Sequence, residues 1–297
     1  MKCDLCPRKC LVDRKKGEKG ICGQTENLKV ARAALHFWEE PCISGDAGSG
    51  AVFFSGCPLH CVFCQNENIA NGTVGKEISL ERLVDIFLEL QEKRANNINL
   101  VTPGHFVPQI VKALDQARKE GLTLPVVYNT SSYETVDTIK MLEGYVDIYL
   151  PDFKYMSPVL SKKYSHAPDY AEVVKAAIAE MVRQTGKAVF VNGDEDNLIL
   201  SGTIVRHLTL PGCMADSMQI LKYLHDTYGD MIYISIMNQF TPLSNLEKYP
   251  ELNRRITDEE YETLVDYAIE IGIENGFIQE GNTAEESFIP AFDCEGV

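Results

Sequence analysis

One dense group of candidate metal ligands in this sequence is the triplet Cys57, Cys61 and Cys64, which has the spacing C-x3-C-x2-C. Three thiolates in one tight loop can bind three irons of a 4Fe-4S cluster, whereas an electron-transfer cluster usually has four cysteine ligands. The fourth iron is then open to a small molecule, as a catalytic metal is open to its substrate. The alternatives are a zinc site with His60 as the fourth ligand and a set of structural cysteines. The position of the triplet directly after a predicted strand favours the cluster.

A second group of cysteines lies near the N-terminus, where Cys3, Cys6, Cys10 and Cys22 have the spacing C-x2-C-x3-C-x11-C. Four thiols close in sequence suit a tetrahedral zinc site or an auxiliary iron-sulfur cluster. In a reducing compartment, closely spaced cysteines are more often metal ligands than disulfides. We therefore predict a metal at these four residues, and the spacing leaves open whether it is zinc or a second cluster.

The composition is that of a folded protein, with 45% hydrophobic and 24% charged residues. The net charge of -15 disfavours a nucleic-acid binder, because phosphate recognition depends on Lys and Arg. Residues 1–35 differ from the rest, with 9 Lys/Arg against 4 Asp/Glu and hence a net +5. The first residues lack an apolar signal segment, and no apolar run approaches the ~20 residues that cross a bilayer. We therefore expect a cytoplasmic protein that binds neither nucleic acid nor membrane.

From residue 51 onward, short β-prone runs alternate with stretches that carry apolar residues at helical spacing. We predict strands at 51–55, 98–101, 125–128, 146–150, 203–210 and 231–237, and helices near 79–94, 107–120, 134–143, 169–185, 215–228 and 257–271. Successive β-α units form a parallel sheet covered by helices, either open and doubly wound or curled into a barrel. In both architectures ligands bind at the carboxyl ends of the strands.

Residues with reactive or polar side chains gather after these predicted strands: Thr102 and His105 after the second, Asn129 after the third, Asp152 and Lys154 after the fourth, and Cys213 after the fifth. Cys213 and His105 are candidate catalytic residues. A thiol there can donate hydrogen, carry a radical or bind metal, and the alternative is a small buried hydrophobic residue. The alternative for His105 is a histidine at the start of a helix that bonds to the backbone.

The cysteine triplet and its place after the first strand resemble the radical S-adenosylmethionine (SAM) superfamily. Phe63 and the pair Gln65-Asn66 around the third cysteine resemble the branch related to pyruvate formate-lyase activating enzymes. The chain is also similar to a poorly characterised subgroup of activase-like proteins with an N-terminal C-x2-C-P-R-x-C motif. The resemblance implies an α/β fold, a partial (β/α)6 TIM-like barrel with a small cysteine-rich N-terminal extension. We expect the extension at residues 1–44 and the barrel, with a C-terminal helix, at 45–297.

The resemblance also implies the chemistry. In the superfamily the amino and carboxylate groups of SAM chelate the open iron, and one electron breaks the bond between sulfur and C5'. The resulting 5'-deoxyadenosyl radical abstracts hydrogen from a substrate. The protein positions these cofactors and supplies the electrostatic environment. The resemblance therefore implies a 4Fe-4S cluster, SAM, and an oxidoreductase of the activating-enzyme type.

Several residues match the motifs with which the family binds SAM. Phe63 is expected beside the adenine, and Asp152 and Lys154 match a D-x-K motif that meets the SAM carboxylate and ribose. Arg206 resembles a strand arginine near the SAM carboxylate, which a guanidinium can bind with two hydrogen bonds. The alternative is a surface ion pair for Asp152 with Lys154, and a structural arginine. The predicted cofactor site also includes Asn66, Thr102 and Asn129.

One motif departs from the family pattern. The family's Gly-Gly-Glu after the second strand binds the SAM amino group, and here that place is Thr102-Pro103-Gly104-His105. A threonine hydroxyl and a histidine cannot reproduce the charge of a carboxylate. SAM is therefore held differently in this chain, or substrate chemistry occupies this place.

Two classes of substrate fit the resemblance. One is a glycine Cα-H in a partner protein, as the activation of a glycyl-radical enzyme requires, and the other is a small molecule modified at an unactivated carbon. In both cases a reductant such as flavodoxin or ferredoxin supplies the electron. A rival hypothesis is a non-catalytic zinc or iron-sulfur protein whose basic N-terminal module docks on a partner.

Overall fold

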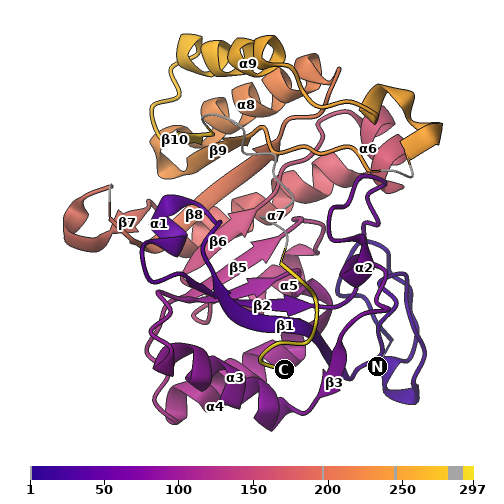
Figure 1. The fold of residues 1–297 in the computed structure, drawn as a ribbon, viewed down its shortest axis with the longest axis vertical. Helices are drawn as coiled ribbons and strands as arrows, with labels where there is room; N and C mark the ends of the chain where they lie inside the picture. Colours follow the sequence, from indigo (N-terminus) through magenta and orange to yellow (C-terminus); the bar gives the residue numbers. More distant parts are fainter. Residues whose placement is uncertain (1, 196, 244–245, 280–289) are drawn as a thin grey trace.

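The centre of the fold is a curved sheet with the strand order β10-β9-β8-β6-β5-β4-β2-β1-β3 (Figure 1). The computed structural model describes residues 2–195, 197–243, 246–279 and 290–297. The parallel strands are β2 (Ser49–Phe54), β4 (Ile98–Val101), β5 (Val126–Thr130), β6 (Ile148–Pro151), β8 (Ile199–Leu208), β9 (Tyr233–Met237) and β10 (Gly276–Ile278). Each of the six from β2 to β9 is followed by a helix, so the predicted partial (β/α)6 barrel is confirmed.

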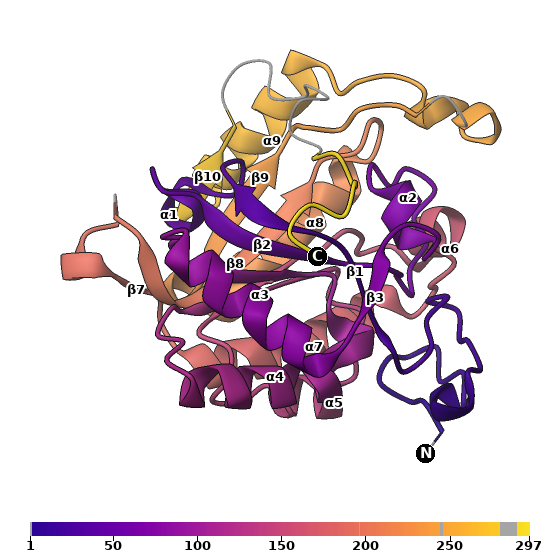
Figure 2. The same cartoon turned by 60° about the horizontal axis from the view of Figure 1, so that its bottom comes forward.

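The helices cover the outer face of this sheet (Figure 2). They are α3 (Leu80–Glu92), α4 (Val107–Lys119), α5 (Val136–Lys140), α7 (Tyr170–Thr185), α8 (Met214–Tyr228) and α9 (Asp258–Glu270). Their apolar faces are buried at helical spacing, as Leu83, Phe87 and Leu90 of α3 illustrate. Among the helices of the described residues, none has the length and apolar character needed to span a bilayer.

The sheet extends further toward the N-terminus than the sequence predicted. β1 (Leu28–His36) pairs antiparallel with β2, and β3 (Lys76–Ile78) pairs antiparallel with β1. Residues 28–36, expected in the N-terminal extension, are therefore part of the sheet, because their small and apolar side chains are buried against it. Further short elements outside the prediction are α1 (Pro41–Ser44), α2 (Glu67–Ala70), α6 (Pro158–Ser165) and β7 (Val189–Phe190).

The N-terminal segment packs against the side of the barrel, beside α2 and β3 (Figures 1 and 2). The buried guanidinium of Arg14 donates a hydrogen bond to the carbonyl oxygen of His105 and lies 5.4 Å above the ring of Phe106. Arg8 Nε donates to the carbonyl oxygen of Pro58 at 2.9 Å. These contacts fix the segment to the loops that follow β2 and β4.

The last residues of the chain lie along β1. The backbone N–H of Cys294 donates to Ala31 O at 3.0 Å, and the N–H of Ala33 donates to Glu295 O at 2.8 Å. Arg32 adds an ion pair to Asp293 at 3.0 Å. Residues 290–297 thereby cover the strand that borders the barrel opening.

Candidate active site

A cavity of about 260 Å³ opens at the carboxyl ends of the parallel strands. The triplet Cys57, Cys61 and Cys64 lines it from the loop after β2. The seven residues predicted to bind the cofactor also line it: Phe63, Asn66, Thr102, Asn129, Asp152, Lys154 and Arg206. Segments far apart in the sequence therefore meet at the end of the barrel where such folds bind ligands.

Burial controls the protonation of thiols in the triplet. It raises the pKa of Cys57 to about 11 and the pKa of Cys64 to about 12, and the charge of Cys61 acts in the same direction. Cys61 Sγ accepts a hydrogen bond from Ser165 Oγ at 3.0 Å. Without metal, Cys57 and Cys64 are protonated at neutral pH, and metal binding displaces their protons. Within the described ranges, no three His, Cys, Asp or Glu side chains are grouped to hold a single metal ion.

The ring of His60, considered above as a fourth zinc ligand, contacts the N-terminal segment. Its Nε2 lies 2.7 Å from the carbonyl oxygen of Ile21. His60 has a φ of 51°, an uncommon value for a residue with a side chain. The strained backbone and the hydrogen bond together give His60 a role in joining two loops.

Arg206 on β8 is the centre of an ionic network in the cavity wall. Its Nε donates to Asp152 Oδ1 at 3.0 Å, and its Nη1 donates to Glu39 Oε2 at 3.0 Å. Its Nη2 donates to Asn129 Oδ1 at 2.6 Å. Burial opposes the charge of the guanidinium, but the surrounding carboxylates outweigh burial and raise the pKa of Arg206 above its usual range. The guanidinium is therefore charged and held in one orientation.

Asp152 joins Arg206 to Lys154. Lys154 Nζ donates to Asp152 Oδ2 at 2.6 Å, and the two side chains are only 16% and 15% exposed. Burial opposes the charge of Asp152, but the two cations outweigh burial and lower the pKa of its carboxyl. The pair therefore lies inside the cavity, and the alternative of a surface ion pair does not hold.

Glu39 is the residue of this network that the sequence reasoning missed. Its carboxylate accepts hydrogen bonds from Asn99 Nδ2 at 3.2 Å and Asn129 Nδ2 at 3.0 Å, besides the ion pair with Arg206. β1 runs antiparallel to β2, so Glu39 approaches the barrel interior from the end opposite to the loops that follow the parallel strands. The available signal was a β-prone run, residues 28–36, followed by two acidic residues.

The segment that carries the triplet matches a known protein family. Residues 51–197 match the Radical SAM superfamily. The chain belongs to the radical SAM superfamily. An uncharacterized protein of Methanocaldococcus jannaschii is 27% identical over 275 residues, which cover 90% of this chain and 74% of that protein.

Several solved structures share the fold. SuiB of Streptococcus suis bound to S-adenosylmethionine superposes with a TM-score of 0.52 at 12% identity, over 75% of this chain and 48% of SuiB. HydG, a maturase of the [FeFe]-hydrogenase, gives a TM-score of 0.51 at 14% identity, over 76% of this chain and 50% of HydG. Methylornithine synthase, PylB, gives 0.51 at 15% identity, over 75% and 60%. The chain thus spans about half of the length of the first two, and these low identities show a common fold alone.

Radical SAM enzymes use a 4Fe-4S cluster and SAM, and the residues of the cavity fit both groups. The three thiols are soft ligands of the type that iron-sulfur clusters require. Arg206 and Lys154 carry two positive charges, and Asp152 and Glu39 carry two negative charges. A set balanced in this way suits the carboxylate and the cationic amino and sulfonium groups of SAM. The cavity volume, about 260 Å³, leaves room for a small molecule.

The two candidate catalytic residues lie apart from the residues that line this cavity. Cys213 precedes α8 and packs against the buried apolar cluster that includes Ile220 and Leu221 of that helix. Burial raises the pKa of its thiol to about 11. His105 lies in a short 3₁₀ turn, Gly104–Phe106, where its Nε2 bonds to the carbonyl oxygen of Ser55 at 2.7 Å. Burial lowers the pKa of His105 to about 3, so its ring is neutral. His105 bonds to the backbone, as in its structural alternative, and Cys213 is only partly buried; the catalytic roles of both residues stay predictions.

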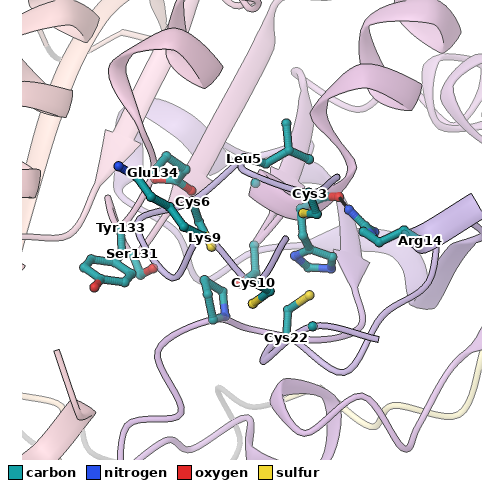
Figure 3. A pocket seen from close by; sticks show the side chains of 15 residues that line it. Cys3, Leu5, Cys6, Lys9, Cys10, Arg14, Cys22, Ser131, Tyr133 and Glu134 are labelled. Atoms are coloured by element: carbon teal, nitrogen blue, oxygen red, sulfur yellow. Dashed lines mark hydrogen bonds between the residues drawn. The ribbon is translucent and has the colours of Figure 1, made fainter. Parts of the chain in front are cut away.

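The four N-terminal cysteines line a second, smaller cavity, of about 20 Å³. The side chains of Cys3, Cys6, Cys10 and Cys22 surround a common space between the N-terminal segment and the barrel (Figure 3). Thr102, in the place of the family's Gly-Gly-Glu motif, lines both cavities. Its φ of 55° is rare for a β-branched residue, and such strain is concentrated at functional sites.

Proposed function

We propose that this radical SAM enzyme activates a glycyl-radical enzyme by abstracting hydrogen from a glycine Cα of that partner protein. When bound, the cluster and SAM supply reductive cleavage of the sulfonium and a radical that removes hydrogen. A reductant such as flavodoxin or ferredoxin provides the electron. The chain's own contribution is to bind SAM, to orient it against the triplet and to admit the glycine.

The charged network supports the binding part of this proposal. Arg206 is held by three acceptors, so it can meet the SAM carboxylate without a further loss of side-chain freedom. Glu39 supplies a buried carboxylate that the segment after β4 lacks, and it holds Arg206 in place. Phe63 is 5% exposed and packs edge-on against Phe240, which gives the adenine an apolar wall.

The observation that carries the choice of a protein substrate is the rim of the cavity. Trp38 lines the cavity and is 59% exposed, and its neighbour Phe37 is 50% exposed. Aromatic side chains of this kind are enriched where proteins bind other protein chains. A second SuiB structure, with a TM-score of 0.51, is bound to the precursor peptide SuiA, so a related fold accepts a peptide.

The test is an anaerobic mixture of the chain, SAM, a one-electron reductant and a candidate glycyl-radical enzyme. The proposal predicts an electron paramagnetic resonance (EPR) signal of a glycyl radical in the partner, together with 5'-deoxyadenosine. Omitting SAM is the control and should remove both. Formation of 5'-deoxyadenosine without a protein radical, but in proportion to turnover of an added small molecule, would refute a protein substrate.

Trp38→Ala is the matched variant for the rim. The variant should retain SAM cleavage in the absence of a partner, because Trp38 lies outside the charged network. Its yield of glycyl radical should fall. An unchanged yield of glycyl radical would show that Trp38 takes no part in binding the partner protein.

A further inference from the structure

The cavity between the N-terminal segment and the barrel has the features of a second metal centre. Four thiols line it: Cys3, Cys6, Cys10 and Cys22. Their backbone supports this arrangement, because Ile21 N–H donates to Cys10 Sγ at 3.3 Å and Leu11 N–H donates to Cys3 O at 3.0 Å. The four thiols therefore line one space without a covalent link between them (Figure 3). No three of them are already grouped to hold a metal ion in this structure, so metal binding has to draw them together.

Charge in this cavity suits four thiolates. Arg14 and Lys9 line it, and Arg14 is 8% exposed. A buried guanidinium needs acceptors or negative charge nearby, and Arg14 donates hydrogen bonds to the backbone oxygens of Thr25 and His105. A metal centre bound by four thiolates carries net negative charge. The two cations are placed to balance that charge.

Two buried polar side chains from the barrel also line this cavity, and both are 5% exposed. His105 Nε2 donates to Ser55 O, which leaves Nδ1 as an acceptor with no partner. The Glu134 carboxyl accepts from Thr130 Oγ1 and also interacts with the Tyr128 hydroxyl. Thiolate and sulfide sulfur accept hydrogen bonds and do not donate them, so the support for a metal centre comes from the four thiols and the two cations.

The choice of a cluster over zinc rests on the neighbouring barrel site and not on the size of this cavity. The volume of about 20 Å³ is room for about one water, so the loop has to open further when a cubane binds. Zinc has no redox chemistry, whereas an iron-sulfur cluster beside a site that consumes electrons can supply them.

The two thiol sites are close neighbours. Pro58 lines the N-terminal cavity, and the adjacent Cys57 lines the cavity of the barrel. Thr102 and Ser131 line both. The two cavities therefore share part of one wall, which makes the N-terminal site a neighbour from which an electron can reach the barrel site.

We propose that Cys3, Cys6, Cys10 and Cys22 bind a second iron-sulfur cluster, which passes electrons to the cluster of the barrel. One electron enters from an external one-electron reductant of the flavodoxin or ferredoxin type, and one electron leaves for the barrel site. The basic surface of residues 1–35, with a net +5, suits an acidic donor. The electron transfer requires the radical SAM chemistry of the barrel, whereas binding of the cluster does not.

The decisive variant removes the barrel ligands and keeps the N-terminal ones: Cys57→Ala, Cys61→Ala and Cys64→Ala together. After anaerobic reconstitution, this variant should bind about four irons and four sulfides and show the EPR signal of a reduced cubane after dithionite. Adding Cys6→Ser and Cys10→Ser to this variant should remove both the bound iron and sulfide and the EPR signal. Cys294→Ser in the triple variant is the matched control and should change neither. A triple variant that binds no iron, or that binds zinc when both metals are supplied, would overturn the proposal.

The electron path has its own test, in the full chain with Cys6→Ser and Cys10→Ser alone. This variant should cleave SAM with dithionite, which reaches the barrel site directly, and should lose cleavage when reduced flavodoxin is the only donor. Equal rates with flavodoxin in variant and wild type would refute the relay. The two proposals can fail separately. If the triple variant binds iron but the wild type generates no glycyl radical in any partner, only the proposed function is contradicted. If the triple variant binds no iron but the wild type does generate the glycyl radical, only this inference is contradicted.

Discussion

The two thiol cavities of this chain differ in the number of ligands and in the space that they enclose. The barrel site has three cysteines at the edge of a cavity of about 260 Å³, with a balanced set of charges beside them. The N-terminal site has four cysteines around about 20 Å³. A missing ligand together with space makes a site that can bind a substrate, and a complete ligand set in a closed space makes one that can store or pass electrons.

The largest effect should come from removing one ligand of the barrel site. Cys61→Ala should abolish SAM cleavage, because the remaining two thiols cannot hold the cluster in place. The measurement is chromatography for 5'-deoxyadenosine after dithionite. Metal at the N-terminal site should persist, so that the variant separates the two cavities. Retained activity would remove the triplet from the mechanism.

Arg206→Met tests whether the charges of the barrel cavity act as one network. It leaves the carboxylates of Glu39 and Asp152 without their shared cation, and breaking a buried pair in this way costs about 3–5 kcal/mol of unfolding free energy. Urea unfolding of the metal-free protein measures the loss. Lys119→Met is the matched control, because Lys119 forms its ion pair with Asp115 at the surface, and it should stay close to wild type. Equal stabilities of both variants would contradict the network.

Glu134→Gln tests the wall of the N-terminal cavity through pH. Burial raises the pKa of Glu134 to about 7, so the folded metal-free protein binds a proton there that the unfolded chain has released. The contribution of this carboxyl to folding stability is fully present below pH 4.5 and is lost as the pH rises through 7. Wild type should therefore lose up to about 3 kcal/mol relative to the variant over this window. Thermal unfolding of both proteins at pH 5 and pH 8 measures this loss of stability. A difference in stability between wild type and variant that is the same at both pH values would refute the prediction.

Glu39→Gln should have the smallest effect of the four changes. The amide retains the shape and the acceptor oxygen, but Arg206 loses one charged partner. We expect a loss of about 2 kcal/mol in SAM binding, roughly 30-fold in Kd, with an unchanged iron content. Calorimetric titration of SAM into the anaerobic protein measures it. Unchanged affinity would limit Glu39 to a purely structural role.

Much of the barrel and its site could be predicted from local pattern. The six strands and their helices have strong periodicity, and their observed bounds lie within a few residues of the prediction. Asp152, Lys154 and Asn129 were found because parallel strands bring their carboxyl ends together. These relations depend on neighbours in sequence and on one general property of the fold.

Features that depend on contacts between distant segments were not predicted. Glu39 reaches the network from the opposite end of the barrel, because β1 is antiparallel to β2. The position of the N-terminal cysteines against Pro58 and Ser131 likewise depends on contacts such as Arg8 with the Pro58 carbonyl. Local patterns contain no information on such pairings. The pairing of residues 28–36 with the sheet was missed for the same reason.

The barrel cluster should have three protein ligands and an open iron that SAM binds. This is measured by EPR and electron-nuclear double resonance of the reduced Cys6→Ser, Cys10→Ser variant, with and without isotopically labelled SAM. The variant lacks two N-terminal ligands, so its signal comes from the barrel site. We predict a shift of the EPR signal on addition of SAM and hyperfine coupling from the labelled amino or carboxylate group. An identical signal with and without SAM, and no coupling, would contradict the open iron.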